Sequence, residues 1–248
     1  MAEHLKLFIL GPARSGTSIM YFAAREVLGL KGKGESHVVP VFDQMVRLYQ
    51  SHVAKYKDTP ALAGALEIEP FRRSIAEFLR KFYGSAYPDG SWVDKTPGRV
   101  LGVPLIFKAF PDARVVIARR TGIETVMSHM AKFDRDFDRV CRLWARAMKD
   151  IVALRNRPRS LVGRVLEQDQ FDLSNDTEAS AVRIAGHVGQ PGMAGALAAF
   201  FRDRRVQKSS RHAWDRRLTL AETPWPDEQK AIFVRECGPM METFGYPM

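Results

Sequence analysis

The sequence predicts an α/β fold in which a parallel β-sheet is flanked by helices. Short apolar stretches alternate along the chain with longer stretches whose apolar residues recur at helical spacing. Strands that are separated by helices connect most readily as parallel neighbours, and the helices then cover both faces of the sheet. No repeat, low-complexity tract or linker-like change in composition interrupts the 248 residues, so we expect a single domain over residues 1–248.

Four short segments have the composition of buried strands. The segment Leu5–Leu10 is apolar and is followed at once by a Gly-Pro pair. Arg114–Ala118 is rich in β-branched residues, which favour strands. Trp92–Val93 and Leu161–Leu166 are shorter or weaker candidates. Because ligands of parallel sheets bind beyond the carboxyl ends of the strands, we expect the site in the loops that follow the first two of these segments.

Helical periodicity begins where the first strand candidate and its loop end. Apolar residues recur at helical spacing from Thr17 to Leu30, and a second amphipathic helix follows Pro70, with Gly84 as its expected end. Further helices are predicted over residues 98–110, 122–132, 137–156, 176–188 and 227–244.

The charge balance indicates an anionic partner. Lys and Arg number 38 against 28 Asp and Glu, which gives a formal net charge of +10 and a pI near 9.8. Nucleic acid, an acidic membrane and a phosphorylated small molecule all fit such an excess. The two cysteines, Cys141 and Cys237, exclude a disulfide framework and a thiolate metal site.

Nothing in the chain predicts a membrane span. No apolar run approaches the ~18–20 residues that a transmembrane helix needs. The first residues also lack the basic and then apolar layout of a signal peptide. We therefore expect a soluble, cytoplasmic protein without an integral membrane segment.

The loop over residues 11–18, between the first strand and the first helix, has the layout of a phosphate-binding loop. Its two glycines, Gly11 and Gly16, lie five residues apart and hydroxyl residues follow them. Successive backbone N–H groups and a helix N-terminus form an anion site in such loops. Thr17 stands where a nucleoside triphosphatase needs its lysine, and the cation of the loop is Arg14. The loop is therefore equipped for a phosphate but poorly equipped for ATP hydrolysis.

The segment Phe8–Ser18 resembles the 5′-phosphosulfate loop of the sulfotransferases that use 3′-phosphoadenosine 5′-phosphosulfate (PAPS). That loop usually has the sequence Pro-Arg-Ser-Gly-Thr-Thr, whereas here Ala13 separates the proline from the arginine. The resemblance implies the P-loop-like fold of this family and PAPS as the sulfonyl donor. It also implies the residues that bind the phosphosulfate, which are Arg14, Ser15, Gly16, Thr17 and Ser18.

A second motif follows in the order that the family shows. Its 3′-phosphate motif is a strand that ends in an arginine, with a serine eight residues later in the next helix, and Arg120 and Ser128 have this spacing. An arginine at a strand end can donate two hydrogen bonds to a phosphate while the serine donates its hydroxyl. Arg119 is the alternative to Arg120, because the sequence does not fix which of the two faces the donor.

The resemblance also supplies candidates for the chemistry. Lys95, in the segment Asp-Lys-Thr-Pro, matches a lysine that the family places near the leaving phosphate. Residues 33–40 are similar to the segment of tyrosylprotein sulfotransferases that carries the catalytic glutamate, which corresponds to Glu35. His37 is the alternative base, because an imidazole titrates near neutrality and many cytosolic sulfotransferases use histidine. Sulfonyl transfer needs a base and cations but no metal, so no metal site is predicted.

The last third of the chain extends the match. Residues 202–217 carry a net charge of +5, and Lys208–Trp214 within them resembles the segment that covers the donor in the family. Within it, Lys208 and Arg211 are the residues predicted to reach the 3′-phosphate.

Together these features predict a sulfotransferase that moves the sulfonyl group of PAPS to a hydroxyl and releases adenosine 3′,5′-bisphosphate (PAP). The acceptor is left open between a small molecule, a carbohydrate and a lipid-linked molecule, and so is the oligomeric state. The alternative function is a P-loop kinase without its usual lysine, which predicts Mg²⁺-dependent ATP binding. A nucleic-acid partner is not expected, because it leaves the Arg14 loop without a role.

Overall fold

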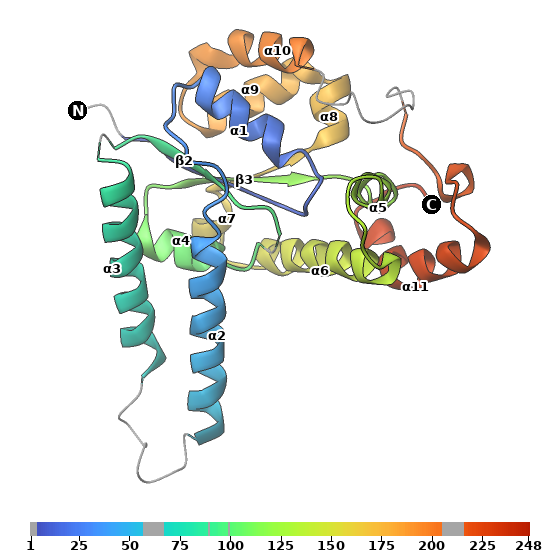
Figure 1. Ribbon diagram of the computed structural model, residues 1–248. Coiled ribbons are helices and arrows are strands. Elements are labelled where there is room, and N and C mark those ends of the chain that lie inside the picture. The colour runs from blue at the N-terminus through green and yellow to red at the C-terminus, as the bar shows by residue number, and fades with distance from the viewer. Residues whose placement is uncertain (1–3, 57–66, 89, 99, 205–215) are drawn as a thin grey trace.

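A parallel four-stranded sheet with the order β2-β1-β3-β4 lies at the centre of the molecule (Figure 1). The computed structural model describes residues 4–56, 67–88, 90–98, 100–204 and 216–248. The strands are β1 (Lys6–Leu10), β2 (Trp92–Lys95), β3 (Arg114–Arg119) and β4 (Val165–Asp169). The prediction of a parallel sheet flanked by helices is confirmed.

Helices connect the strands and cover the sheet. They are α1 (Thr17–Glu26), α2 (Val38–Tyr56), α3 (Ile68–Ala86), α4 (Val103–Ala109), α5 (Gly122–Met130), α6 (Phe137–Arg155), α7 (Arg159–Val162), α8 (Gln170–Asn175), α9 (Thr177–His187), α10 (Ala194–Asp203) and α11 (Asp227–Thr243). Two 3₁₀ turns, η1 (Pro191–Met193) and η2 (Leu220–Glu222), complete the described elements. No helix in this part of the chain is both long and apolar enough to cross a membrane.

Alternation along the central strands divides the core into two layers. Phe8 and Leu10 of β1 pack in a cluster with α3, α4, α6 and α11, whereas Leu7 and Ile9 pack with α1, α9 and α10. Successive side chains of a strand point to opposite faces of the sheet, so a strand that is covered on both sides is apolar throughout. This is why β1 lacks the polar–apolar alternation of a half-exposed strand. Figure 1 shows the same two layers of helices on either side of the sheet.

The fourth strand and several helix bounds differ from the prediction. The strand predicted over Leu161–Leu166 was wrong in its first half, because Leu161 and Val162 end the short helix α7 and β4 begins at Val165. The helix predicted over 98–110 begins only at Val103, and the first helix ends at Glu26. Gly84 does not end α3, which continues to Ala86.

Helices α2 and α3 form a hairpin that extends away from the sheet (Figure 1). Aromatic pairs join the two helices, with ring centroids 4.8 Å apart for Phe42 and Phe78 and 4.3 Å apart for Tyr49 and Phe71. The sequence did not predict α2 as a helix. Val39, Phe42, Val46 and Tyr49 share one packed face of α2, but Val41, Met45 and Leu48 are exposed on another, so the apolar residues of the helix are not confined to one stripe.

A buried histidine makes the stability of this fold depend on pH. His187, at the end of α9, donates a hydrogen bond from Nε2 to the carbonyl oxygen of Val115 in β3 (3.0 Å), and burial lowers its pKa to about 4. Between pH 6.5 and pH 4 the unfolded chain therefore takes up a proton that the folded chain does not, and the free energy of unfolding falls. This loss is about 2 kcal/mol at pH 5 relative to neutral pH.

The substitution His187→Gln tests this effect, because glutamine keeps a donor for Val115 but does not titrate. We expect the free energy of unfolding in urea to fall between pH 7 and pH 5 by about 2 kcal/mol more in the wild type than in the variant. Equal losses in the two proteins would assign the pH dependence to other groups.

Candidate functional site

The loop between β1 and α1 lies directly against the end of β3. Gly11 has φ of 134°, and a Cβ atom at this position would lie 2.0 Å from the carbonyl oxygen of Ala118, so only glycine fits. The hydroxyl of the fully buried Ser15 lies 2.7 Å from the oxygen of Pro12 and 2.8 Å from that of Ala118. The close approach of Gly11 and the hydroxyl of Ser15 therefore fix the loop to the backbone of β3.

The same loop leaves the N-terminus of α1 uncapped by a side chain. Gly16 is the N-cap residue, has φ of 97° and provides no side-chain acceptor for the first N–H groups of the helix. Thr17 is buried and Ser18 is exposed at this end of α1. Uncapped N–H groups and the positive end of the helix dipole favour a bound anion, as the sequence predicts.

A hydrogen bond joins the two phosphate motifs that the sequence identifies. Arg14 Nε donates to Ser128 Oγ of α5 over 3.1 Å, although the two residues are 114 positions apart. Arg14 has φ of 71°, a left-handed conformation that is uncommon for residues other than glycine. The chain thus brings the Arg14 guanidinium and the Ser128 hydroxyl together at the carboxyl edge of the sheet.

Buried polar atoms without a partner surround this pair. Among the described residues, Thr125 Oγ1, His129 Nδ1 and Gln170 Oε1 have no hydrogen-bond partner. Thr125 lies one turn before Ser128 on α5 and one turn before His129, and a Cβ atom on Gly16 would lie 3.4 Å from Gln170 Cγ. Burial lowers the pKa of His129, and the charges of Arg135 and Arg14 lower it further. Polar atoms that are buried without a partner fit a site for a polar ligand.

Arg119 and Arg120 have different surroundings. Arg119 Nη1 donates to Asp169 Oδ2 (2.8 Å) and to the hydroxyl of Tyr246 (2.7 Å), so it joins β3 to β4 and to the C-terminal segment. Arg120 is buried, and its Nε lies 3.4 Å from Glu124 Oε2. Burial lowers the pKa of Arg120, the carboxylate of Glu124 raises it, and the charge of Arg14 lowers it again. Of the two arginines, Arg120 is therefore the one whose charge is repelled by that of Arg14.

The three candidate catalytic residues lie together at the end of β2. Lys95 Nζ donates to Glu35 Oε1 over 2.6 Å and to Ser18 Oγ over 3.4 Å. The other carboxylate oxygen of Glu35 lies 3.3 Å from His37 Nε2. The side chain of Lys95 is 10% exposed, whereas those of Glu35 and His37 are 39% and 56% exposed. The lysine therefore lies on the inner side of this group, and the two candidate bases face solvent.

A buried carboxylate holds the segment that carries Glu35. Asp94 Oδ2 accepts hydrogen bonds from Ser36 Oγ (2.8 Å) and from the hydroxyl of Tyr83 (2.7 Å). Burial raises the pKa of Asp94, and burial together with the charge of Asp94 raises that of Tyr83. His37, with φ of 54°, donates its backbone N–H to Thr96 Oγ1 over 3.3 Å. Ser36 and His37, which follow Glu35, are thus fixed to the edge strand β2 and to the residue after it.

Sequence reasoning did not identify Ser36, Tyr83 and Asp94 as part of the site, nor Thr125 and Gln170. The available signal for Asp94 was an acidic residue directly after the apolar pair Trp92–Val93 of a strand candidate. Lys208 and Arg211 lie outside the described residues. Within those residues no group of three His, Cys, Asp or Glu side chains is placed to hold a metal ion, and the metal-free site stays a prediction.

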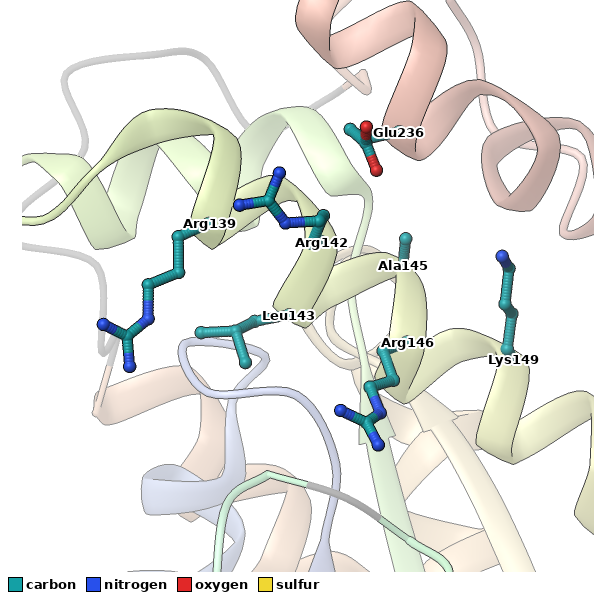
Figure 2. Close-up of a pocket in the computed structure, with 7 residues that line it drawn as sticks. All are labelled: Arg139, Arg142, Leu143, Ala145, Arg146, Lys149 and Glu236. Atoms are coloured by element: carbon teal, nitrogen blue, oxygen red, sulfur yellow. The ribbon is translucent and has the colours of Figure 1, made fainter.

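A separate basic groove lies on α6 and α11 (Figure 2). Its volume is about 430 Å³, and it is lined by Arg139, Arg142, Leu143, Ala145, Arg146, Lys149 and Glu236. None of the predicted site residues that the structure describes lines this groove. Part of the basic excess of the chain therefore lies away from the candidate site.

Comparisons with known proteins agree with this arrangement. A profile of the family described as "Sulfotransferase family" matches residues 6–194. The fold is similar to the sulfotransferase domain of the Synechococcus PCC 7002 olefin synthase, with a TM-score of 0.61 and 16% identity over 99% of this chain and 96% of that one. It is also similar to the sulfotransferase STF9 of Mycobacterium avium, with a TM-score of 0.56 and 14% identity over 100% of this chain and 79% of that one. At these identities the similarity concerns the fold alone. A search of curated protein sequences finds no match.

Proposed function

Because the chain belongs to the sulfotransferase family, we propose that it transfers the sulfonyl group of PAPS to a hydroxyl of an acceptor and releases PAP. The acceptor is a small molecule, a carbohydrate or a lipid-linked molecule. The observation that carries the proposal is the hydrogen bond between Arg14 and Ser128, which unites the two motifs expected to bind the phosphates. Both the single-domain organisation and the cytoplasmic location stay predictions.

The residues at the carboxyl edge of the sheet fit the donor. Arg14, Thr17 and Ser18, with the N–H groups that begin at Ser15 and Gly16, would hold the 5′-phosphosulfate. Arg120 and Ser128 would hold the 3′-phosphate, and Lys208 and Arg211 would add charge from outside the described residues. Arg14 and Arg120 repel each other, and Glu124 is the carboxylate that contacts Arg120. A bound phosphate would offset this repulsion, which favours Arg120 over Arg119 as its ligand.

Glu35 is the group best placed to remove the acceptor proton. It is exposed, and its carboxylate oxygens contact Lys95 on one side and His37 on the other. As the acceptor oxygen bonds to sulfur, its proton passes to Glu35 and the bond between sulfur and the phosphate oxygen of PAP breaks. Lys95, which also contacts Ser18 of the phosphosulfate loop, would stabilise the charge that develops on this leaving oxygen.

His37 would assist rather than replace Glu35. Its ring is the more exposed of the two groups, whereas Glu35 contacts the lysine that reaches the phosphosulfate loop. A base must lie within hydrogen-bond reach of the proton that it removes, and closeness to Lys95 gives Glu35 the better position. The imidazole is then placed to take the proton from Glu35 to solvent.

The donor class is tested by thermal unfolding of the full chain with PAP and, separately, with ATP and Mg²⁺. We expect PAP without metal to raise the melting temperature in a concentration-dependent way, since a ligand that binds only the folded state stabilises it. A P-loop kinase would instead be stabilised by ATP and Mg²⁺. Stabilisation by ATP and Mg²⁺ alone would overturn the proposed function in favour of this alternative.

A further inference from the structure

An exposed apolar stripe begins next to the candidate base and continues along α2. The backbone N–H of Val41 donates to the carbonyl oxygen of His37 over 3.3 Å, so His37 lies one turn before Val41. Val41, Met45 and Leu48 follow at positions that share one face of a helix. They are 57%, 43% and 65% exposed. We call these three residues the α2 stripe.

A different face of α2 packs within the molecule. Phe42 and Tyr49 contact aromatic rings of α3, while Val39 and Val46 are buried. Val39 packs closely against Gly102, the residue before α4. Its Cγ1 lies 2.8 Å from the position that a Cβ atom on Gly102 would occupy. The exposed fractions show that the described residues leave the stripe open. Contiguous apolar residues on a surface mark a site of interaction more often than isolated ones do.

We propose that the α2 stripe binds an apolar chain of the acceptor, so that the acceptor is an alcohol with a long hydrocarbon chain, such as a hydroxylated fatty acyl group or lipid. This inference rests on the proposed function, because it takes Glu35 as the point that the hydroxyl reaches. His37 Nε2 lies 3.3 Å from Glu35 Oε2, and His37 O accepts from Val41 N–H, so the stripe begins one helical turn after a residue that contacts the base. From His37 to Leu48 the chain rises roughly 16 Å, the length of an extended hydrocarbon chain of about a dozen carbons.

The chemistry of the stripe favours a hydrocarbon over a sugar. Valine, methionine and leucine offer no donor or acceptor for the hydroxyl groups of a carbohydrate. Methionine is flexible and adapts to apolar ligands of varied shape. An apolar chain that covers the three side chains removes both surfaces from water, which is favourable in proportion to the area buried.

The test compares the binding of 1-dodecanol and 1-butanol to the full chain, with and without PAP. We expect 1-dodecanol to bind at least roughly 100-fold more tightly, since its eight additional methylenes can contact the stripe. The double substitution Met45→Gln with Leu48→Gln is expected to weaken 1-dodecanol binding roughly tenfold. It should leave the affinity for 1-butanol and for PAP unchanged.

A matched control removes two exposed apolar side chains elsewhere. Val182 on α9 and Val234 on α11 are 61% and 47% exposed, and their double replacement by glutamine should leave 1-dodecanol binding unchanged. In turnover with PAPS and 1-dodecanol, Met45→Gln with Leu48→Gln should raise KM and leave kcat within about twofold, because the stripe does not touch the reacting atoms.

Failures of the two proposals are distinguishable. A chain that binds 1-dodecanol tightly but not PAP contradicts the donor assignment and supports the stripe. A chain that binds PAP but binds the two alcohols equally, or that loses 1-dodecanol equally in both double variants, overturns the stripe. If the stripe variant dissociates a dimer and keeps its affinity for 1-dodecanol, the stripe is a contact between copies of the chain and the inference is wrong.

Discussion

Replacement of Glu35 by glutamine is expected to lower kcat for sulfonyl transfer by about 10³-fold, in the range that loss of a general base produces. Glutamine retains an oxygen that can accept the hydrogen bond from Lys95, which is 2.6 Å long in the wild type. The substitution therefore removes the base while leaving the surrounding contacts in place. Single-turnover measurement of the product, with PAP affinity determined in parallel, separates loss of chemistry from loss of donor binding.

Two further variants decide which residue is the base. We expect His37→Gln to lower kcat less than about fivefold, because the imidazole acts after the proton has reached Glu35. Glu77→Gln, which removes an exposed glutamate of α3 away from Lys95, is the matched control and should leave kcat unchanged. An activity that survives Glu35→Gln and disappears in His37→Gln would assign the base to His37.

Replacement of Arg120 by alanine is expected to weaken PAP binding roughly 10²- to 10³-fold, since a buried charged hydrogen bond to the 3′-phosphate is lost. Removal of Arg120 alone also leaves the buried carboxylate of Glu124 without this partner, which destabilises the fold. The measurement is therefore made in the double variant Arg120→Ala with Glu124→Gln and compared with Glu124→Gln alone. Calorimetric titration with PAP provides the affinities.

Adenosine 5′-phosphosulfate, which lacks the 3′-phosphate, is the control ligand. Its affinity should change less than about threefold in the double variant, because the contacts of the Arg14 loop remain. Arg119→Lys should likewise leave PAP affinity within about threefold, since Arg119 is engaged with Asp169 and Tyr246. Equal weakening of both ligands, or loss of PAP binding in Arg119→Lys, would contradict the role of Arg120.

The parts of the fold that the sequence predicted well are those whose pattern is local. β1 and β3 are short apolar segments covered on both faces, and α6 has one long buried side, so composition and periodicity were sufficient. The helix α2 was missed because its partners are α3 and the segment before α4. Its apolar residues therefore occupy several faces, one of which is exposed. Tertiary contacts of this kind leave no simple period in the sequence.

The site shows the same contrast between residues that local motifs reveal and residues that only tertiary contacts bring together. Resemblance to two motifs of the family was sufficient to select Arg14 and Ser128, which the fold places in contact. Their roles stay predictions, as do those of the other candidate residues. The carboxylate of Asp94 was not selected, because its partners Ser36 and Tyr83 come from two distant segments. A hydrogen-bond network of this kind joins residue types that are common in any loop or helix, so no sequence motif marks it.

The approach of Gly11 and Ser15 to the carbonyl oxygen of Ala118 has a consequence for ligand selection. That carbonyl precedes Arg119 and Arg120, so the proposed phosphate loop is joined, through the Ser15 hydroxyl and the close approach of Gly11, to the strand that leads to the proposed second phosphate ligand. The separation between the two proposed anion-binding points then depends on how the loop packs against the backbone of β3. A fixed separation disfavours nucleotides whose phosphates are spaced differently, such as triphosphates with all three groups on one ribose carbon. The position of the loop relative to the end of β3 would thus help to determine which nucleotides bind.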